Sequence, residues 1–185
     1  VFPFSLGAAL AKAAVPAPVP TENRDRLEGF LRQQERDLAG RLRHRPLPAA
    51  KTALAEPALG ASRRFVFPQF GGVPQQALQA KLVSVAAHAL AWVHEGQPAP
   101  DQAVIDQVIG QFSGEDFQLV GSRFGLPSDV DGDGRVSFLF SPLVDRVGGL
   151  AGFFSAVSTL PEELGGTGDQ ADLMFLSPTQ QAPEY

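Results

Sequence analysis

Cysteine is missing from the 185-residue sequence, and histidine, methionine, tryptophan and tyrosine are scarce. Without cysteine the chain has no disulfide framework, no thiol nucleophile and no thiolate metal site. No apolar run approaches the ~20 residues that a membrane-spanning helix needs, so we expect no membrane span. Apolar residues still make up 44% of the sequence, which is enough for a globular domain with a buried core.

The three histidines, His44, His88 and His94, do not form a zinc-peptidase motif. His94-Glu95 begins like His-Glu-x-x-His, but Pro98 stands where the second histidine belongs and would break the helix. The sequence also has no Gly-x-Ser-x-Gly elbow, P-loop or aspartyl dyad. We therefore predict no catalytic residue and no activity for this chain alone.

Residues 166–171 match the Gly-x-Gly-x-x-Ala pattern of dinucleotide-binding loops. They precede a predicted strand instead of joining a strand to a helix, so a bound phosphate would meet no helix N-terminus. We accordingly predict no cofactor-binding residue in this stretch.

Charge is spread unevenly along the chain, whose formal net charge is −5. Residues 1–64 contain eleven lysines and arginines against six acids, whereas residues 65–185 contain four against fourteen. Such asymmetry indicates two segments with different roles. The basic residues of the first segment alternate with acids, which is typical of a solvated helix face and not of a nucleic-acid-binding patch. We expect no nucleic-acid partner.

Three segments follow from composition. Residues 1–20 are rich in alanine and proline and are either a disordered arm or the remnant of a removed export signal. The second interpretation favours a secreted or cell-envelope protein. Residues 21–64 are expected to form a helical arm, with a helix over 21–45, followed by an Ala/Pro-rich linker. Residues 65–185 form the main domain, which we expect to be incomplete at its C-terminus.

The main domain alternates short apolar runs with one strong helical pattern. Residues 77–95 fit either a helix or two strands, because periodicity alone does not separate the two. The other expected elements are a strand over 64–70, a helix from 101 to 112 that Gly114 closes, and a second helical piece over 115–123. Strands are expected over 136–140 and 173–176, with a glycine-rich loop over 148–168 between them. This order predicts an α/β fold, with α+β as the alternative, built on a mixed sheet with one or two packed helices.

The most specific local pattern is an acidic loop that begins at Asp129. Asp129, Asp131 and Asp133 occupy positions 1, 3 and 5, and glycine at position 6 lets the loop turn sharply. With the backbone carbonyl of Arg135 at position 7, these oxygens suit a calcium ion. The pattern departs from an EF-hand because position 12 is Phe140 and not a bidentate glutamate.

A further calcium ligand would have to come from elsewhere, with Asp145 and Asp116 as candidates. The alternative is an acid-rich turn that holds no metal. Three carboxylates at this spacing repel one another unless a cation neutralises them, so we predict calcium, with reduced affinity.

The order of several segments resembles the hyicolysin-type secreted neutral zinc metallopeptidases. The resemblance covers about residues 77–177, and its most specific part is the block from Ser128 to Val136. The other matching segments are 80–85, 91–95, a helix ending near Phe112, Phe124-Gly125, 137–140, 149–154 (GLAGFF) and 172–176. It implies two strands over 77–95 and a metallopeptidase-like half-domain.

In that family a His-Glu-x-x-His helix follows the strand that 173–176 resembles, and it binds zinc. The sequence up to Tyr185 does not contain this motif. The resemblance therefore implies an N-terminal scaffold, with zinc held only by a C-terminal catalytic half that also meets the protein or peptide substrate. The alternatives are a non-catalytic, calcium-stabilised binding or adhesion module, and a prosegment.

Overall fold

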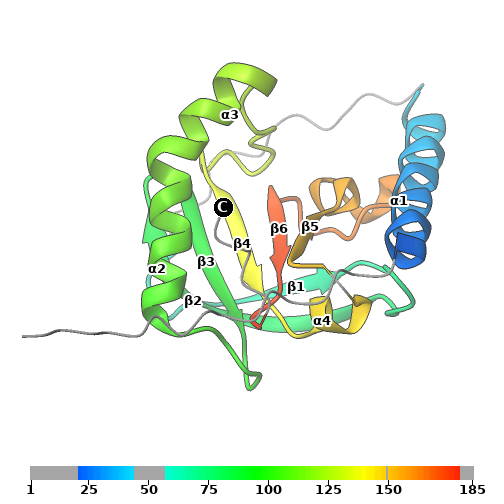
Figure 1. Cartoon of the computed structure of the whole chain (residues 1–185). Helices are drawn as coiled ribbons and strands as arrows, with labels where there is room; N and C mark the ends of the chain where they lie inside the picture. Colours follow the sequence, from blue (N-terminus) through cyan, green and yellow to red (C-terminus); the bar gives the residue numbers. More distant parts are fainter. Residues whose placement is uncertain (1–20, 44–56, 149, 180–185) are drawn as a thin grey trace, which may run out of the picture.

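A computed structural model describes residues 21–43, 57–148 and 150–179, with side chains in the first helix described from Glu28 onward. The predicted leader remnant and most of the predicted linker lie outside these residues. The described chain forms one six-stranded mixed sheet with helices packed against it (Figure 1). The predicted α/β class with a mixed sheet is confirmed.

The sheet has the strand order β1-β2-β3-β4-β6-β5. The first three strands are antiparallel neighbours, β3, β4 and β6 run parallel, and β5 closes the far edge antiparallel to β6. The strands are β1 (Ser62–Phe67), β2 (Gln76–Ala86), β3 (Ala89–His94), β4 (Val136–Phe140), β5 (Gly152–Phe154) and β6 (Leu173–Leu176).

Residues 77–95 form two strands, β2 and β3, as the resemblance implied. The first half of β2 alternates strictly, with Leu78, Ala80 and Leu82 buried and the residues between them exposed. That period of two fits a pleated strand with one face on a core and excludes a helix. Strand β1 lies at the edge of the sheet and ends before Pro68, where a missing backbone N–H costs no ladder bond.

The helix predicted from 101 to 112 does not close at Gly114, and it runs without a break into the second helical piece predicted over 115–123. Helix α2 (Gln102–Gln111) continues through a π-helical turn, η1 (Phe112–Asp116), into α3 (Phe117–Phe124). The Phe112 ring packs on Phe138 of β4 with ring centroids 4.9 Å apart, so the helix is held on the sheet at the point where glycine would favour a stop. It ends instead at Gly125, whose φ of +91° few other residues adopt.

The glycine-rich stretch 148–168 is not only loop, which corrects a second expectation. It contains the edge strand β5 and two short 3₁₀ turns, η2 (Ala156–Thr159) and η3 (Glu162–Leu164). A Cβ at Gly152 would lie 2.6 Å from the carbonyl oxygen of Phe175, so glycine is what lets β5 approach β6. Helix α4 (Leu143–Val147) was not predicted.

The two faces of the sheet bury separate cores. One core is aromatic, and α1 (Thr21–Leu42) packs against it through Phe30 and Leu31. The Phe30 ring meets Phe70 edge to face, with centroids 5.9 Å apart. The other core joins Ile105 and Ile109 of α2 to the opposite face of the sheet. Within the described residues, no helix combines the length and apolarity that crossing a membrane requires.

Candidate metal centre

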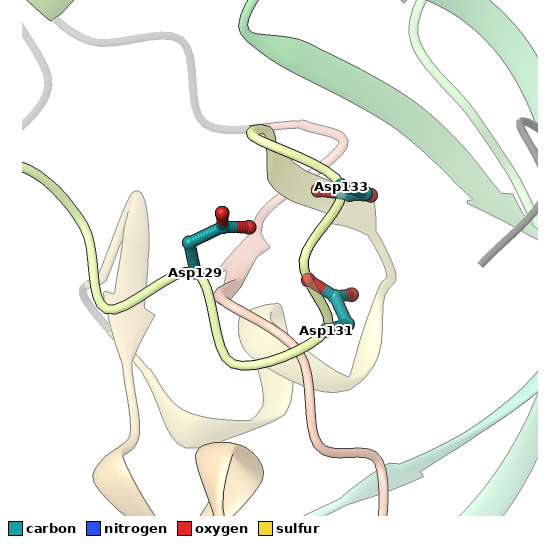
Figure 2. Close-up of side chains that lie close together, drawn as sticks. All are labelled: Asp129, Asp131 and Asp133. Atoms are coloured by element: carbon teal, nitrogen blue, oxygen red, sulfur yellow. The ribbon is translucent and has the colours of Figure 1, made fainter. Parts of the chain in front are cut away.

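The three predicted aspartates lie together in the loop that joins α3 to β4. One carboxylate oxygen from each of Asp129, Asp131 and Asp133 lies within 4.8 Å of the others. Figure 2 shows the carboxylates of Asp129 and Asp131 turned toward the inside of the loop. The loop precedes β4, so the cluster lies at the N-terminal end of the parallel strands β4 and β6.

Backbone hydrogen bonds set the shape of this loop. The N–H of Gly134 donates to Oδ1 of Asp129 (2.8 Å), and the N–H of Arg135 donates to Oδ1 of Asp133 (2.7 Å). Gly132 and Gly134 have φ values of +71° and +68°, which lets the chain turn inside the ring of acids. Each of the two bonded carboxylates keeps a second oxygen that a cation can use.

Asp131 is the buried member of the cluster. Its side chain is 2% exposed, and its Oδ1 has no hydrogen-bond partner. Among the described side chains, Ser158 Oγ is the only other buried nitrogen or oxygen atom without a hydrogen-bond partner. Burial, followed by the charge of Asp133, raises the pKa of Asp131 to about 6, and burial also raises the pKa of Asp133. A buried carboxylate with an unpartnered oxygen is unfavourable alone and favourable beside a cation.

Asp172 supports the loop from the start of β6, and sequence reasoning missed this role. It is 5% exposed; its Oδ1 accepts from Ser128 Oγ (2.5 Å) and its Oδ2 accepts from the Val130 N–H (3.3 Å). The two bonds fix both flanks of Asp129. The available signal was an acid directly before a buried strand that starts at the same edge of the sheet as the loop.

The remaining ligand candidates are not gathered into the cluster. Asp145 lies in α4 and accepts a hydrogen bond from Ser177, which follows β6 at its C-terminal end. Asp116 ends the π-helical turn. The guanidinium of Arg135 donates from Nε to the Ala86 carbonyl (3.2 Å), toward the turn between β2 and β3. The role of the Arg135 backbone carbonyl as a calcium ligand stays a prediction.

The two described histidines are also outside the acidic cluster. His88 stacks on Phe117 with ring centroids 4.0 Å apart and an interplanar angle of 5°. His94 Nδ1 lies 2.9 Å from Ser141 Oγ, and burial, followed by the charge of Arg146, lowers the pKa of His94. Each imidazole thus has a packing or hydrogen-bonding role within the fold.

The glycine pattern of residues 166–171 lies between η3 and β6, so no helix follows it. Asp169 within it accepts from the Val66 N–H (3.0 Å) and from Thr167 Oγ1 (2.6 Å), which ties the segment to β1. Burial raises the pKa of Asp169 to about 6. The segment is part of the packing and does not have the strand-to-helix geometry of a dinucleotide site.

The cluster therefore offers hard oxygen ligands only, in a turn that is already formed. Three carboxylates and one backbone carbonyl supply fewer than the 6–8 oxygens that calcium prefers, so water or another ligand would fill the remaining positions. A comparison of the chain with protein-family models gives no match, and a comparison with curated proteins gives none either.

Proposed function

We propose that the acidic loop binds calcium and that the bound ion stabilises the N-terminal edge of the parallel strands. The observation that carries the proposal is Asp131, whose buried Oδ1 has no partner and lies beside two further carboxylates. Calcium tolerates irregular oxygen coordination, whereas magnesium requires a near-ideal octahedron. An irregular loop with three aspartates therefore favours calcium over magnesium.

The ion would act on stability through the contacts of the loop. Asp172 connects the loop to β6, and the N–H of Val136 donates to the His88 carbonyl (3.0 Å), which connects the start of β4 to the turn before β3. A ligand that binds only the folded state stabilises it by about 2.7 kcal/mol at a hundredfold excess over its dissociation constant.

Isothermal titration calorimetry tests the proposal directly. Calcium is expected to bind with a stoichiometry of one and more tightly than magnesium, and Asp131→Asn is expected to abolish the heat. The matched control is Glu115→Gln, which removes one exposed acid outside the cluster and should leave the affinity unchanged. No calcium heat in the wild-type chain, or the same affinity in Asp131→Asn, would refute the site.

A second proposal concerns the larger protein: this chain is the N-terminal scaffold of a secreted zinc metallopeptidase. It is supported by the order of the matching segments, because 80–85 and 91–95 fall in β2 and β3, the acidic block precedes β4, and 172–176 contains β6. Zinc and the general base would belong to a C-terminal catalytic half, and the substrate would be a protein or peptide.

The reading frame beyond Tyr185 decides between this proposal and its alternatives. A helix with His-Glu-x-x-His soon after Tyr185 would support the scaffold, and a stop codon there would favour a binding module or prosegment. Metal analysis and a casein assay of the purified chain complete the test. We expect neither zinc nor cleavage; stoichiometric zinc that is lost on mutation of His88 or His94 would contradict this expectation.

A further inference from the structure

Exposed apolar side chains gather at the C-terminal end of α3, close to the acidic loop. Phe124 is 87% exposed and Leu126 is 73% exposed, whereas most large apolar side chains of the described domain are buried. Of the six most exposed large hydrophobic residues in the described chain, four belong to residues 119–126. We call Leu119, Val120, Phe124 and Leu126 the apolar tip; a group of this kind marks an interaction surface.

The backbone of the apolar tip forms a regular helix end. The N–H of Gly125 donates to the Gly121 carbonyl (3.0 Å), which ends α3 in a formed cap. The Leu126 side chain then lies against the last turn of the helix: its Cδ2 would be only 3.1 Å from a Cβ at Gly121. In Figure 1, α3 extends beyond the ends of the strands, so this part of the helix has no sheet beneath it.

The apolar tip and the acidic loop are neighbours in space because they are neighbours in the chain. Asp129 comes three positions after Leu126, so their Cα atoms lie at most about 11 Å apart. Asp129 and Asp133 are partly exposed, so an ion held by the loop would lie close to solvent. The positions that the loop does not fill are then open to oxygens from outside the protein.

Charge decides which surface such an arrangement fits. Residues 115–135 contain five acids and two arginines, so without a metal ion this part of the protein repels an anionic surface. With calcium bound, phosphate or carboxylate oxygens of lipid headgroups can complete the coordination of the ion. Apolar side chains beside that contact can then enter the boundary between headgroups and acyl chains.

We propose that the apolar tip and the calcium-loaded loop together dock on an anionic phospholipid membrane, in a calcium-dependent manner. This inference rests on the calcium site proposed above. Phe124 and Leu126 supply the apolar contact, and the ion supplies both the attraction to the headgroups and the calcium dependence. A phosphatidylcholine membrane offers the apolar contact and phosphate oxygens, but it has neither the serine carboxylate nor a net negative charge to attract the ion, so binding to it is expected to be much weaker.

Vesicle co-sedimentation tests this inference. The chain is mixed with vesicles of phosphatidylcholine alone or of phosphatidylcholine with phosphatidylserine, in calcium or in chelator. We expect sedimentation only with phosphatidylserine and calcium, with release on adding chelator. Phe124→Gln should weaken vesicle binding about tenfold. Because Phe124 contacts little of the protein, this variant should keep the wild-type thermal melt and calcium affinity. Leu59→Gln, which alters a 66% exposed leucine before β1, should bind vesicles as the wild type does.

The outcomes separate this inference from the calcium site. Calcium binding in calorimetry without vesicle binding, vesicle binding in chelator, or unchanged binding by Phe124→Gln overturns the membrane proposal and leaves the calcium site in place. Absence of calcium heat in calorimetry removes both. Self-association that Phe124→Gln abolishes, without any vesicle binding, would assign the apolar tip to a second copy of the chain and overturn the membrane proposal.

Discussion

Replacing Asp131 by asparagine should have opposite effects on stability with and without calcium. In chelator the wild-type loop holds a buried carboxylate whose Oδ1 has no partner, so removing that charge is expected to stabilise the fold. In calcium the same carboxylate is a ligand, and the variant loses the stabilisation that the ion provides. The variant is therefore expected to be the more stable protein in chelator and the less stable one in calcium.

The size of the first effect follows from the pKa of Asp131. Burial and the neighbouring acids raise it from 3.8 to about 6. At 1.36 kcal/mol per pKa unit, this difference corresponds to an upper limit of about 3 kcal/mol at neutral pH. Solvent around the partly exposed neighbours screens the charge, so about 1–2 kcal/mol is expected. For a chain of this length that is about 2 to 8 °C in melting temperature.

Thermal melts of both proteins in chelator and in excess calcium provide the assay. Wild type is expected to gain about 2.7 kcal/mol, or about 5 to 11 °C, at a hundredfold excess over the dissociation constant. Asp131→Asn should show no such gain, while Glu115→Gln should respond to calcium as the wild type does. A variant that melts below wild type in chelator would refute the reasoning, because Asp131 would then stabilise the fold without a metal.

Further predictions concern the residues that support the loop and the core. Asp172→Asn should weaken calcium binding by about 10–100-fold, because it loosens the support of the ligands; an unchanged affinity in calorimetry would contradict the role of Asp172. The buried Trp92 Nε1 donates to Ser137 Oγ (3.2 Å), so Ser137→Ala should cost about 1–3 kcal/mol, read from urea unfolding by the fluorescence of the single tryptophan. The pKa of Asp169 is raised to about 6, so the folded state holds its proton longer than the unfolded state. Its contribution to stability therefore falls as pH rises from about 4 to about 6. Urea unfolding across this range should show a smaller pH dependence in Asp169→Asn, and identical slopes would contradict the assignment.

The features predicted correctly from sequence are those that local patterns determine. In the acidic loop an aspartate occurs at every second position, and the turn at Gly132 and Gly134 brings these aspartates together wherever the loop lies in the fold. Strands β4 and β6 match the ranges expected from their apolar runs. Residues 77–95 show the limit of this reasoning, because their periodicity allowed two answers and only the resemblance favoured strands.

The features that sequence reasoning missed depend on distant partners. The residues around Gly152 have the composition of a loop, yet Gly152 begins strand β5. It does so because a glycine there allows the backbone of β6 to approach closely. Gly114 lies inside a continuous helix. This helix is held on the sheet by the contact of Phe112 with Phe138, which belongs to a strand that comes later in the chain. Asp172 is 44 residues from Ser128, so its support of the loop is visible only after β4 and β6 are placed side by side. A local sequence pattern carries no information about these contacts between residues far apart in the chain.

The order of the strands also has a consequence for the kinetics of folding. Strands β1, β2 and β3 follow one another in the chain and in the sheet, whereas Ala89 of β3 pairs with Val136 of β4 and Ser137 pairs with Leu173 of β6. Pairings that close such long loops are expected to form late, after the antiparallel strands. The aspartates of the acidic loop are close in the chain, but Asp172 can support them only once β4 and β6 have paired, which belongs to this late half. Calcium would then slow unfolding and leave the rate of folding almost unchanged.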